Sequence, residues 1–322
     1  MHTDIAQSTA GTHLEGPVFW IGFLSLIVAL LLLDLLWFHR KPRRIGPKEA
    51  FGWVCFWVAL AVGFNGFIYL QLGTTRALEF STGYLVELAL SLDNVLVFLV
   101  IFRYFKVPSH YEHRVLFWGI IGAIVLRGIF IVVGAALVNR FQWLLYLFGA
   151  FLVFTAIKLV VQKDEGFDPG HNPILKLLRK AIPITHDYHG QKFFVRHAQG
   201  LAATPLLAVL VIVDFADLIF AVDSIPAIFG VTRDAFIVFT SNIFAILGLR
   251  ALYMLISGIM DRFHYLRFGL GAVLFFIGAK MLVAPWVHVP VGASLAIVGG
   301  LIGGAILVSF LHPVAPSIPK GE

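Results

Sequence analysis

Two apolar stretches of the chain carry the same acidic signature with the same internal spacing. They read Glu87-x5-Asp93-Asn94 and Asp217-x5-Asp223-Ser224. Each residue of the first lies 130 positions before its counterpart in the second. A carboxylate in the hydrocarbon core of a bilayer costs about 3 kcal/mol or more unless it is paired or neutralised. Four such groups in matched positions therefore indicate a path for a cation.

The ligands that these signatures offer are carboxylates, an amide and a hydroxyl, and Asp214 adds a carboxylate one turn before Asp217. Such hard oxygen donors suit Mg²⁺, Ca²⁺ or Mn²⁺. Zinc and copper fit less well, because no histidine lies near the centre of an apolar stretch and Cys55 is the only cysteine. Clustered acids hold protons that a metal must displace, which is the minimum chemistry for cation/proton exchange. No permanently bound cofactor is expected.

Helical geometry decides which of these groups can face one another. At about 100° per residue, Glu87, Ser91 and Asn94 share a face, whereas Asp93 lies about 240° around from Glu87. Asp223 stands in the same relation to Asp217, so either the helices are interrupted or several sites exist. Pro226 lacks an N–H and predicts an interruption beside Asp223.

Other polar residues in the apolar stretches have two readings each. Arg127 and Arg250 predict either counter-ions that pair with the acids inside the bundle or a gate that occupies the site without metal. Ser91, Ser241 and Asn242 are candidates for lining the path, although such groups also join helices without transport. Lys158 and Lys280 lie near the ends of apolar runs and are expected to extend toward the interface.

The composition places these motifs in a membrane. Of 322 residues, 59% are hydrophobic and 13% are charged, with a mean hydropathy of +0.90, which predicts one polytopic, all-α membrane domain over 1–322. About nine apolar runs are long enough to span as helices. They are 17–38, 49–71, 79–103, 115–138, 142–162, 205–229, 235–257, 264–283 and 291–311.

Lysine and arginine predict the orientation, because short basic loops stay in the cytoplasm. They concentrate in 39–48, 103–114 and 163–200, which puts the N-terminus outside and the C-terminus inside. The net charge of +6 is explained by this topology and by anionic lipid, so no nucleic-acid partner is expected. The only sizeable loop, 163–200, is too short for a catalytic domain and predicts a gate or a connector, so the chain is not expected to be an enzyme.

The resemblance between the two acidic stretches continues downstream. A span with Arg127 precedes Gly149-x8-Lys158, and Arg250 precedes Gly271-x8-Lys280. The unit is thus three spans, 79–162 and 205–283, and an odd number gives an inverted-topology repeat, as in secondary transporters. In the last run, Gly299-x3-Gly303 and Gly300-x3-Gly304 allow close helix contact, within one chain or in a homodimer.

Three segments carry a resemblance to a known family: VELALSLDN at 86–94, DLIFAVDSIPA at 217–227 and TSNIFAILGLR at 240–250. With them the chain resembles the TerC family of bacterial integral membrane proteins. The family was named for an association with tellurium resistance, and members have been described as manganese exporters, some linked to metal loading of secreted enzymes. The residues that match the family's acidic motifs are Glu87, Asp93, Asn94, Asp217, Asp223 and Ser224.

The resemblance implies a bacterial inner-membrane protein that exports Mn²⁺ from the cytoplasm, with exported metalloproteins as further partners. The oxygen ligand set leaves Ca²⁺ and Mg²⁺ open as cargo. Two other functions also stay open. One is a non-transporting assembly factor or scaffold for the metal loading of exported proteins, and the other is a tellurite-response or redox component.

Overall fold

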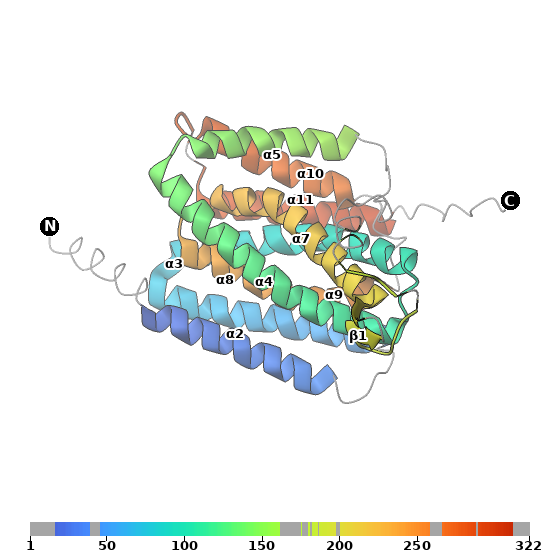
Figure 1. The fold of residues 1–322 in the computed structure, drawn as a ribbon. Coiled ribbons are helices and arrows are strands. Elements are labelled where there is room, and N and C mark those ends of the chain that lie inside the picture. The colour runs from blue at the N-terminus through green and yellow to red at the C-terminus, as the bar shows by residue number, and fades with distance from the viewer. Residues whose placement is uncertain are drawn as a thin grey trace.

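The protein is an all-α membrane protein, seen here in a computed structural model (Figure 1). The structure describes residues 17–38, 46–161, 175, 180, 182–185, 187–197, 200–257, 266–287 and 289–311. Both chain ends and much of 163–200 lie outside the described residues, so the expected N-out orientation and the role of that loop stay predictions.

Helices cover most of the described residues. In chain order the elements are α2 (Pro17–Phe38), α3 (Pro47–Tyr104), α4 (Ser109–Arg140), α5 (Leu144–Val161), β1 (Phe194–His197), β2 (Gly200–Ala203), α7 (Pro205–Phe229), α8 (Ala235–Leu247), α9 (Leu249–Ile256), α10 (Leu266–Val283) and α11 (Val291–Leu311). Within the described part of the chain, six helices are long and apolar enough to cross a membrane, counting α8 and α9 as one, and two shorter helices are apolar as well.

Helix α3 is a hairpin of two arms, 47–72 and 74–104, that folds back at Gly73. Residues 16 apart in a straight helix are separated by about 24 Å, yet the Nδ2 atom of Asn65 donates a hydrogen bond of 2.8 Å to Oγ of Ser81. Gly73 has φ 83° and ψ 179°, a conformation that glycine adopts without the steric cost of a side chain. Figure 1 shows the two arms running side by side.

The second arm of α3 lies at the centre of the bundle, in contact with α7, α8 and α9. Helix α4 crosses α7 and α8. Rings from both arms of α3 and from α8 meet in the core, with Phe64 packed on Phe80 and on Phe244. Large apolar side chains also point outward, such as Phe154 at 64% and Leu70 at 78% exposure, which suits a surface that faces lipid.

A short β-hairpin interrupts the otherwise helical chain and was not expected from the apolar pattern. Strands β1 and β2 pair antiparallel, with Val195 opposite Ala202. Nearby, the hydroxyl of Tyr188 donates to the carbonyl of Phe105 at 2.8 Å. This bond holds the hairpin region against the end of α3.

Helices α5 and α10 approach each other closely. A Cβ atom on Gly278 would lie 2.7 Å from the carbonyl oxygen of Gly149, and one on Gly149 would lie 3.0 Å from that of Gly278. The glycines of α11 behave differently, because a Cβ on Gly299 or Gly303 would meet no atom of the described chain within 4 Å. Their predicted close contact is therefore absent among the described residues, and the homodimer stays a prediction.

These contacts predict opposite outcomes for two glycine substitutions. Gly278→Val should destabilise the protein by about 2 kcal/mol, since its side chain would overlap the α5 backbone. Gly299→Val, with open space around it, should leave stability unchanged. Thermal unfolding in detergent measures both, and equal midpoints for the two variants would contradict the close packing of α5 on α10.

Candidate functional site

Arg127 of α4 is the centre of the buried charge network. Its Nη1 atom donates to Oε1 of Glu87 in α3, and its Nη2 and Nε atoms donate to the two carboxylate oxygens of Asp217 in α7, at 2.8 and 3.0 Å. The three residues are 1%, 0% and 2% exposed. One guanidinium thus holds the two carboxylates that occupy equivalent positions in the repeated signature, in the bidentate geometry that suits arginine.

The network around Arg127 is not fully satisfied. Ser224 and Asn242 accept weaker contacts of 3.5 Å from Nη1. Within the described residues, Oε2 of Glu87, Oγ of Ser91 and Nδ2 of Asn242 are buried without a hydrogen-bond partner. Buried polar atoms are rarely left without a partner unless a water or ion serves them. This centre can therefore take up a small polar species.

The other pair of equivalent acids lines a separate cavity of about 210 Å³. Asp93 of α3 and Asp223 of α7 both line it, together with Thr155 and Lys158 of α5. The hydroxyl of Thr155 donates to Oδ1 of Asp223 at 3.3 Å. Lys158, which was expected to extend toward the interface, is exposed and also lines this cavity with the two carboxylates.

The cavities next to the signature acids differ in volume. A cavity needs a volume of roughly 10–15 Å³ to hold one water. The cavity beside Asp217 holds about 10 Å³, whereas the cavity at Asp93 and Asp223 holds about 210 Å³. The cavity at Asp93 and Asp223 therefore has room for a cation with several waters.

Two residues join these centres, and they are again equivalent in the repeat. Asn94 lines the larger cavity and its Nδ2 atom lies 3.4 Å from Oδ1 of Asp217. Ser224 lines the same cavity and contacts Arg127. A change at one centre can therefore reach the other through one amide and one hydroxyl.

The helices that carry the acids are continuous. The second arm of α3 and all of α7 run unbroken through the signatures, with Pro226 inside α7. The predicted interruption beside Asp223 is thus wrong for this conformation, and the alternative of several sites stays a prediction. Because Glu87 and Asp93 point in different directions on one straight helix, they serve different centres.

Asp214 and the remaining basic candidates lie around this core. A Cβ atom on Gly122 of α4 would lie 2.9 Å from both carboxylate oxygens of Asp214, so a larger residue there would displace that carboxylate. Arg250 in α9 is 2% exposed. Lys280 donates to Ser294 of α11 at 3.0 Å. Lys158, its counterpart in the repeat, instead lines the cavity at Asp93 and Asp223.

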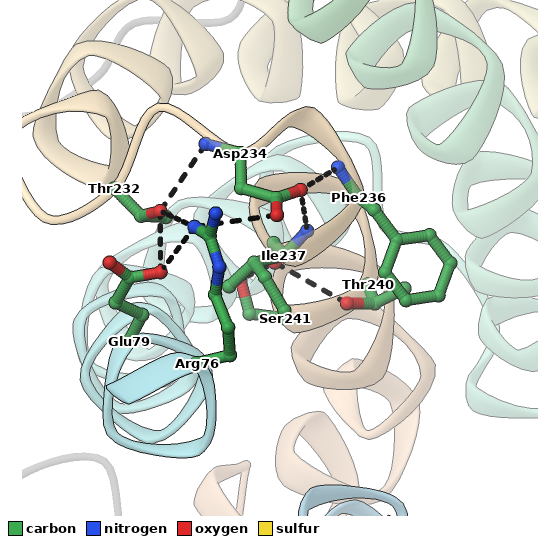
Figure 2. Close-up of polar contacts among 8 residues, drawn as sticks. All are labelled: Arg76, Glu79, Thr232, Asp234, Phe236, Ile237, Thr240 and Ser241. Carbon is green, nitrogen blue, oxygen red and sulfur yellow. Dashed lines mark hydrogen bonds and ion pairs between the residues drawn. The ribbon is translucent and has the colours of Figure 1, made fainter. Parts of the chain in front are cut away.

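A further charged cluster was not predicted from the sequence. Figure 2 shows Arg76 between Glu79 of α3 and Asp234 at the start of α8, at 2.9 and 3.3 Å, with Thr232 donating to Glu79. It borders a cavity of about 510 Å³ that Asn139 also lines. One signal was available, because Asp234 precedes an apolar run and caps it by accepting from two backbone N–H groups.

Ser241, predicted as a path-lining residue, is buried and donates to the carbonyl of Ile237 in its own helix at 2.7 Å. Asn242, the neighbouring candidate, reaches the arginine centre instead. Among the described residues, no group of three or more His, Cys, Asp or Glu side chains comes together. An ion here would depend on amide, hydroxyl and backbone oxygens in addition to carboxylates.

These features define a polytopic membrane protein whose interior holds charged groups from several helices. A family model described as "Integral membrane protein TerC family" matches residues 72–315. The chain belongs to this family, as its signatures predicted. The matched region contains all the acidic signature residues and Arg127.

Curated relatives cover nearly the whole chain. An "Uncharacterized membrane protein STKORF319" from Myxococcus xanthus is 46% identical over 295 residues, covering 92% of each chain. The "Putative membrane-bound redox modulator Alx" is 45% identical in Salmonella typhi, covering 94% of this chain and 96% of the relative, and 44% identical in Escherichia coli K12, covering 92% and 94%. No solved structure matches.

The arginine centre predicts a large stability effect. Arg127→Met should destabilise the protein by about 3–5 kcal/mol, because two buried carboxylates lose their counter-ion. Adding Glu87→Gln and Asp217→Asn should recover part of the loss. Arg140→Met, at the exposed end of the same helix, is the control. A thermal midpoint for Arg127→Met equal to that of the control would contradict a structural role for the buried pair.

Proposed function

We propose that the protein is an inner-membrane transporter that exports Mn²⁺ from the cytoplasm, with Asp93 and Asp223 as its principal cation ligands. The observation that carries the proposal is their convergence on one cavity from two different helices, at equivalent positions of a repeated signature. Asn94 and Ser224 add an amide and a hydroxyl oxygen at the same cavity. This set matches what hard divalent cations prefer.

The choice of manganese and the outward direction rest on the family resemblance, and the oxygen ligands alone suit Ca²⁺ and Mg²⁺ equally. Exchange with protons follows from the chemistry of the acids. A carboxylate pair in a confined space holds a proton when no metal is present, and a divalent ion displaces it. The cation therefore leaves as protons return.

An inverted repeat of three spans is part of the proposal. Equivalent residues of the two repeats meet at three places. Glu87 and Asp217 both contact Arg127, Asp93 and Asp223 line the larger cavity, and Asn94 and Ser224 lie between the two. The contact of α5 with α10 has the same character, because Gly271, the counterpart of Gly149, packs on Val160 and Ala156 as Gly149 packs on the residues around Gly278. Such reciprocal contacts support a two-fold axis in the membrane plane.

Nine spans follow if each arm of α3 crosses the bilayer once. At 1.5 Å per residue, a helix of 58 residues would be about 87 Å long, far beyond one hydrocarbon core of about 30 Å. Each of the two arms on either side of Gly73 is long enough for one crossing. The cavity near Asn139 then faces outside and the β-hairpin faces the cytoplasm.

The relatives' name suggests redox chemistry as a second candidate. Dithiol exchange needs two cysteines, and this chain has only Cys55. A scaffold for the metal loading of exported proteins needs no buried carboxylates in matched positions. Transport is the function to which the cavity at Asp93 and Asp223 contributes directly.

Flux of Mn²⁺ into proteoliposomes tests the transport proposal. Asp93→Asn and Asp223→Asn should each lower the rate at least about tenfold, since each removes a charged ligand while keeping the side-chain volume. Asp187→Asn, an exposed acid near the β-hairpin, should transport like the wild type. If the wild-type protein shows no flux, the transport proposal is wrong and a scaffold role is favoured. Whether the rate depends on a pH gradient tests the exchange of Mn²⁺ for protons.

The orientation has its own test, in a Cys55→Ser background. Asn139→Cys should react with a membrane-impermeant thiol reagent added to intact cells, because basic loops keep the opposite face in the cytoplasm. Arg196→Cys, exposed on β1, should react only after the cells are opened. The reverse pattern would contradict the assigned orientation.

A further inference from the structure

One face of α3 connects the cavity beside Arg76 to the arginine centre. Glu79, Gly83 and Glu87 follow one another every four residues, so they lie along one side of the helix and span about 12 Å. Glu79 lines the cavity, and Glu87 contacts Arg127. The stripe thus begins at one polar region and ends at the other.

Helix α8 faces this stripe with polar groups at the same levels. Asp234 at its start pairs with Arg76 beside Glu79, as Figure 2 shows. Near its middle, Asn242 contacts Arg127 and Ser241 lies against α3. Polar groups of the two helices therefore meet at both ends of this distance, at Asp234 and at Asn242.

Between the two polar regions, Gly83 of α3 packs closely against Ser241 of α8. A Cβ atom on Gly83 would lie 2.8 Å from Oγ and 3.3 Å from Cβ of Ser241, and 3.6 Å from Ile228 of α7. Three helices thus close the gap at this level. Nothing larger than the hydrogen of glycine fits there in the present conformation.

We propose that the cavity beside Arg76 is the outer vestibule of the cation path and that the contact between Gly83 and Ser241 is the constriction that separates it from the buried carboxylates. The inference rests on the proposed transport function and extends it to the exit route. On the inner side of the constriction lie the unpartnered atoms Oε2 of Glu87 and Nδ2 of Asn242. They mark a place where a small polar species can arrive.

The charges of the vestibule suit release of a cation and not its capture. Glu79 and Asp234 are balanced by Arg76 and Arg233, which line the same cavity. A divalent ion therefore meets oxygen ligands without a net negative field to hold it. The side chain of Arg76 is 39% exposed, so it can move away from the acids as the ion passes.

A steric swap tests the constriction with Mn²⁺ as the probe in proteoliposomes. Gly83→Ala should lower Mn²⁺ flux at least about tenfold, because a methyl group would block the gap at Ser241. The double variant Gly83→Ala with Ser241→Gly removes the opposing side chain and should restore most of the rate. Gly299→Ala, in open space, is the matched control, and the thermal midpoint of each variant monitors folding.

The outcomes separate this inference from the proposed function. Flux in the wild type supports transport, and only the ratio between variant and wild type concerns the constriction. Gly83→Ala with wild-type flux would overturn it, as would a folded Gly83→Ala protein whose loss the second change does not repair.

If Gly83→Ala does not fold, the chemical accessibility of position 241 tests the constriction instead. In a Cys55→Ser background, Ser241→Cys should react with an impermeant thiol reagent from the vestibule side faster during Mn²⁺ turnover, by about threefold or more. Ala245→Cys, one turn deeper and 1% exposed, should not change. Equal rates with and without Mn²⁺ at Ser241→Cys would overturn the constriction.

Discussion

The ion pair of Arg127 with Glu87 and Asp217 is the constraint on which the interior of this protein depends. It joins α3, α4 and α7 at a point where water is excluded and an uncompensated carboxylate would be costly. With both acids held by one cation, the helices that carry them are fixed in rotation. That rotation in turn directs Asp93 and Asp223 toward a common cavity on another side of the same two helices.

This arrangement divides labour between chemically similar groups. Glu87 and Asp217 neutralise a buried arginine, while Asp93 and Asp223 border a cavity with room for several waters. Asn94 and Ser224 contact both regions. Under the proposed transport function, a cation in the larger cavity would compete for these two residues and weaken their contacts with the arginine centre, which offers a physical route from binding to rearrangement.

Much of this could be predicted from the sequence. Apolar runs located the helices, and the constant offset between the two signatures paired each acid with its counterpart. The 240° argument on an ideal helix anticipated that Glu87 and Asp93 could not share a site. The choice between a broken helix and several sites could not be made from the sequence. A proline removes one hydrogen bond, but α7 packs against α3, α4 and α5 and stays continuous.

The tertiary partners of individual residues could not be predicted from the sequence either. Nothing local to Lys158 distinguishes it from Lys280, and Glu79 gains its meaning only beside Thr232, on a distant part of the chain.

The pairing of α5 with α10 has a mechanical consequence. The two helices meet main chain against main chain at Gly149 and Gly278, with no flexible side chains between these glycines to absorb a sliding movement. If one helix slid along the other, larger side chains next to the glycines would collide with the facing backbone. A small tilt of the helices about the glycines keeps the same residues in contact. If the two halves of the molecule rock against each other, this crossing is the natural pivot, and the amplitude of the stroke grows with distance from it.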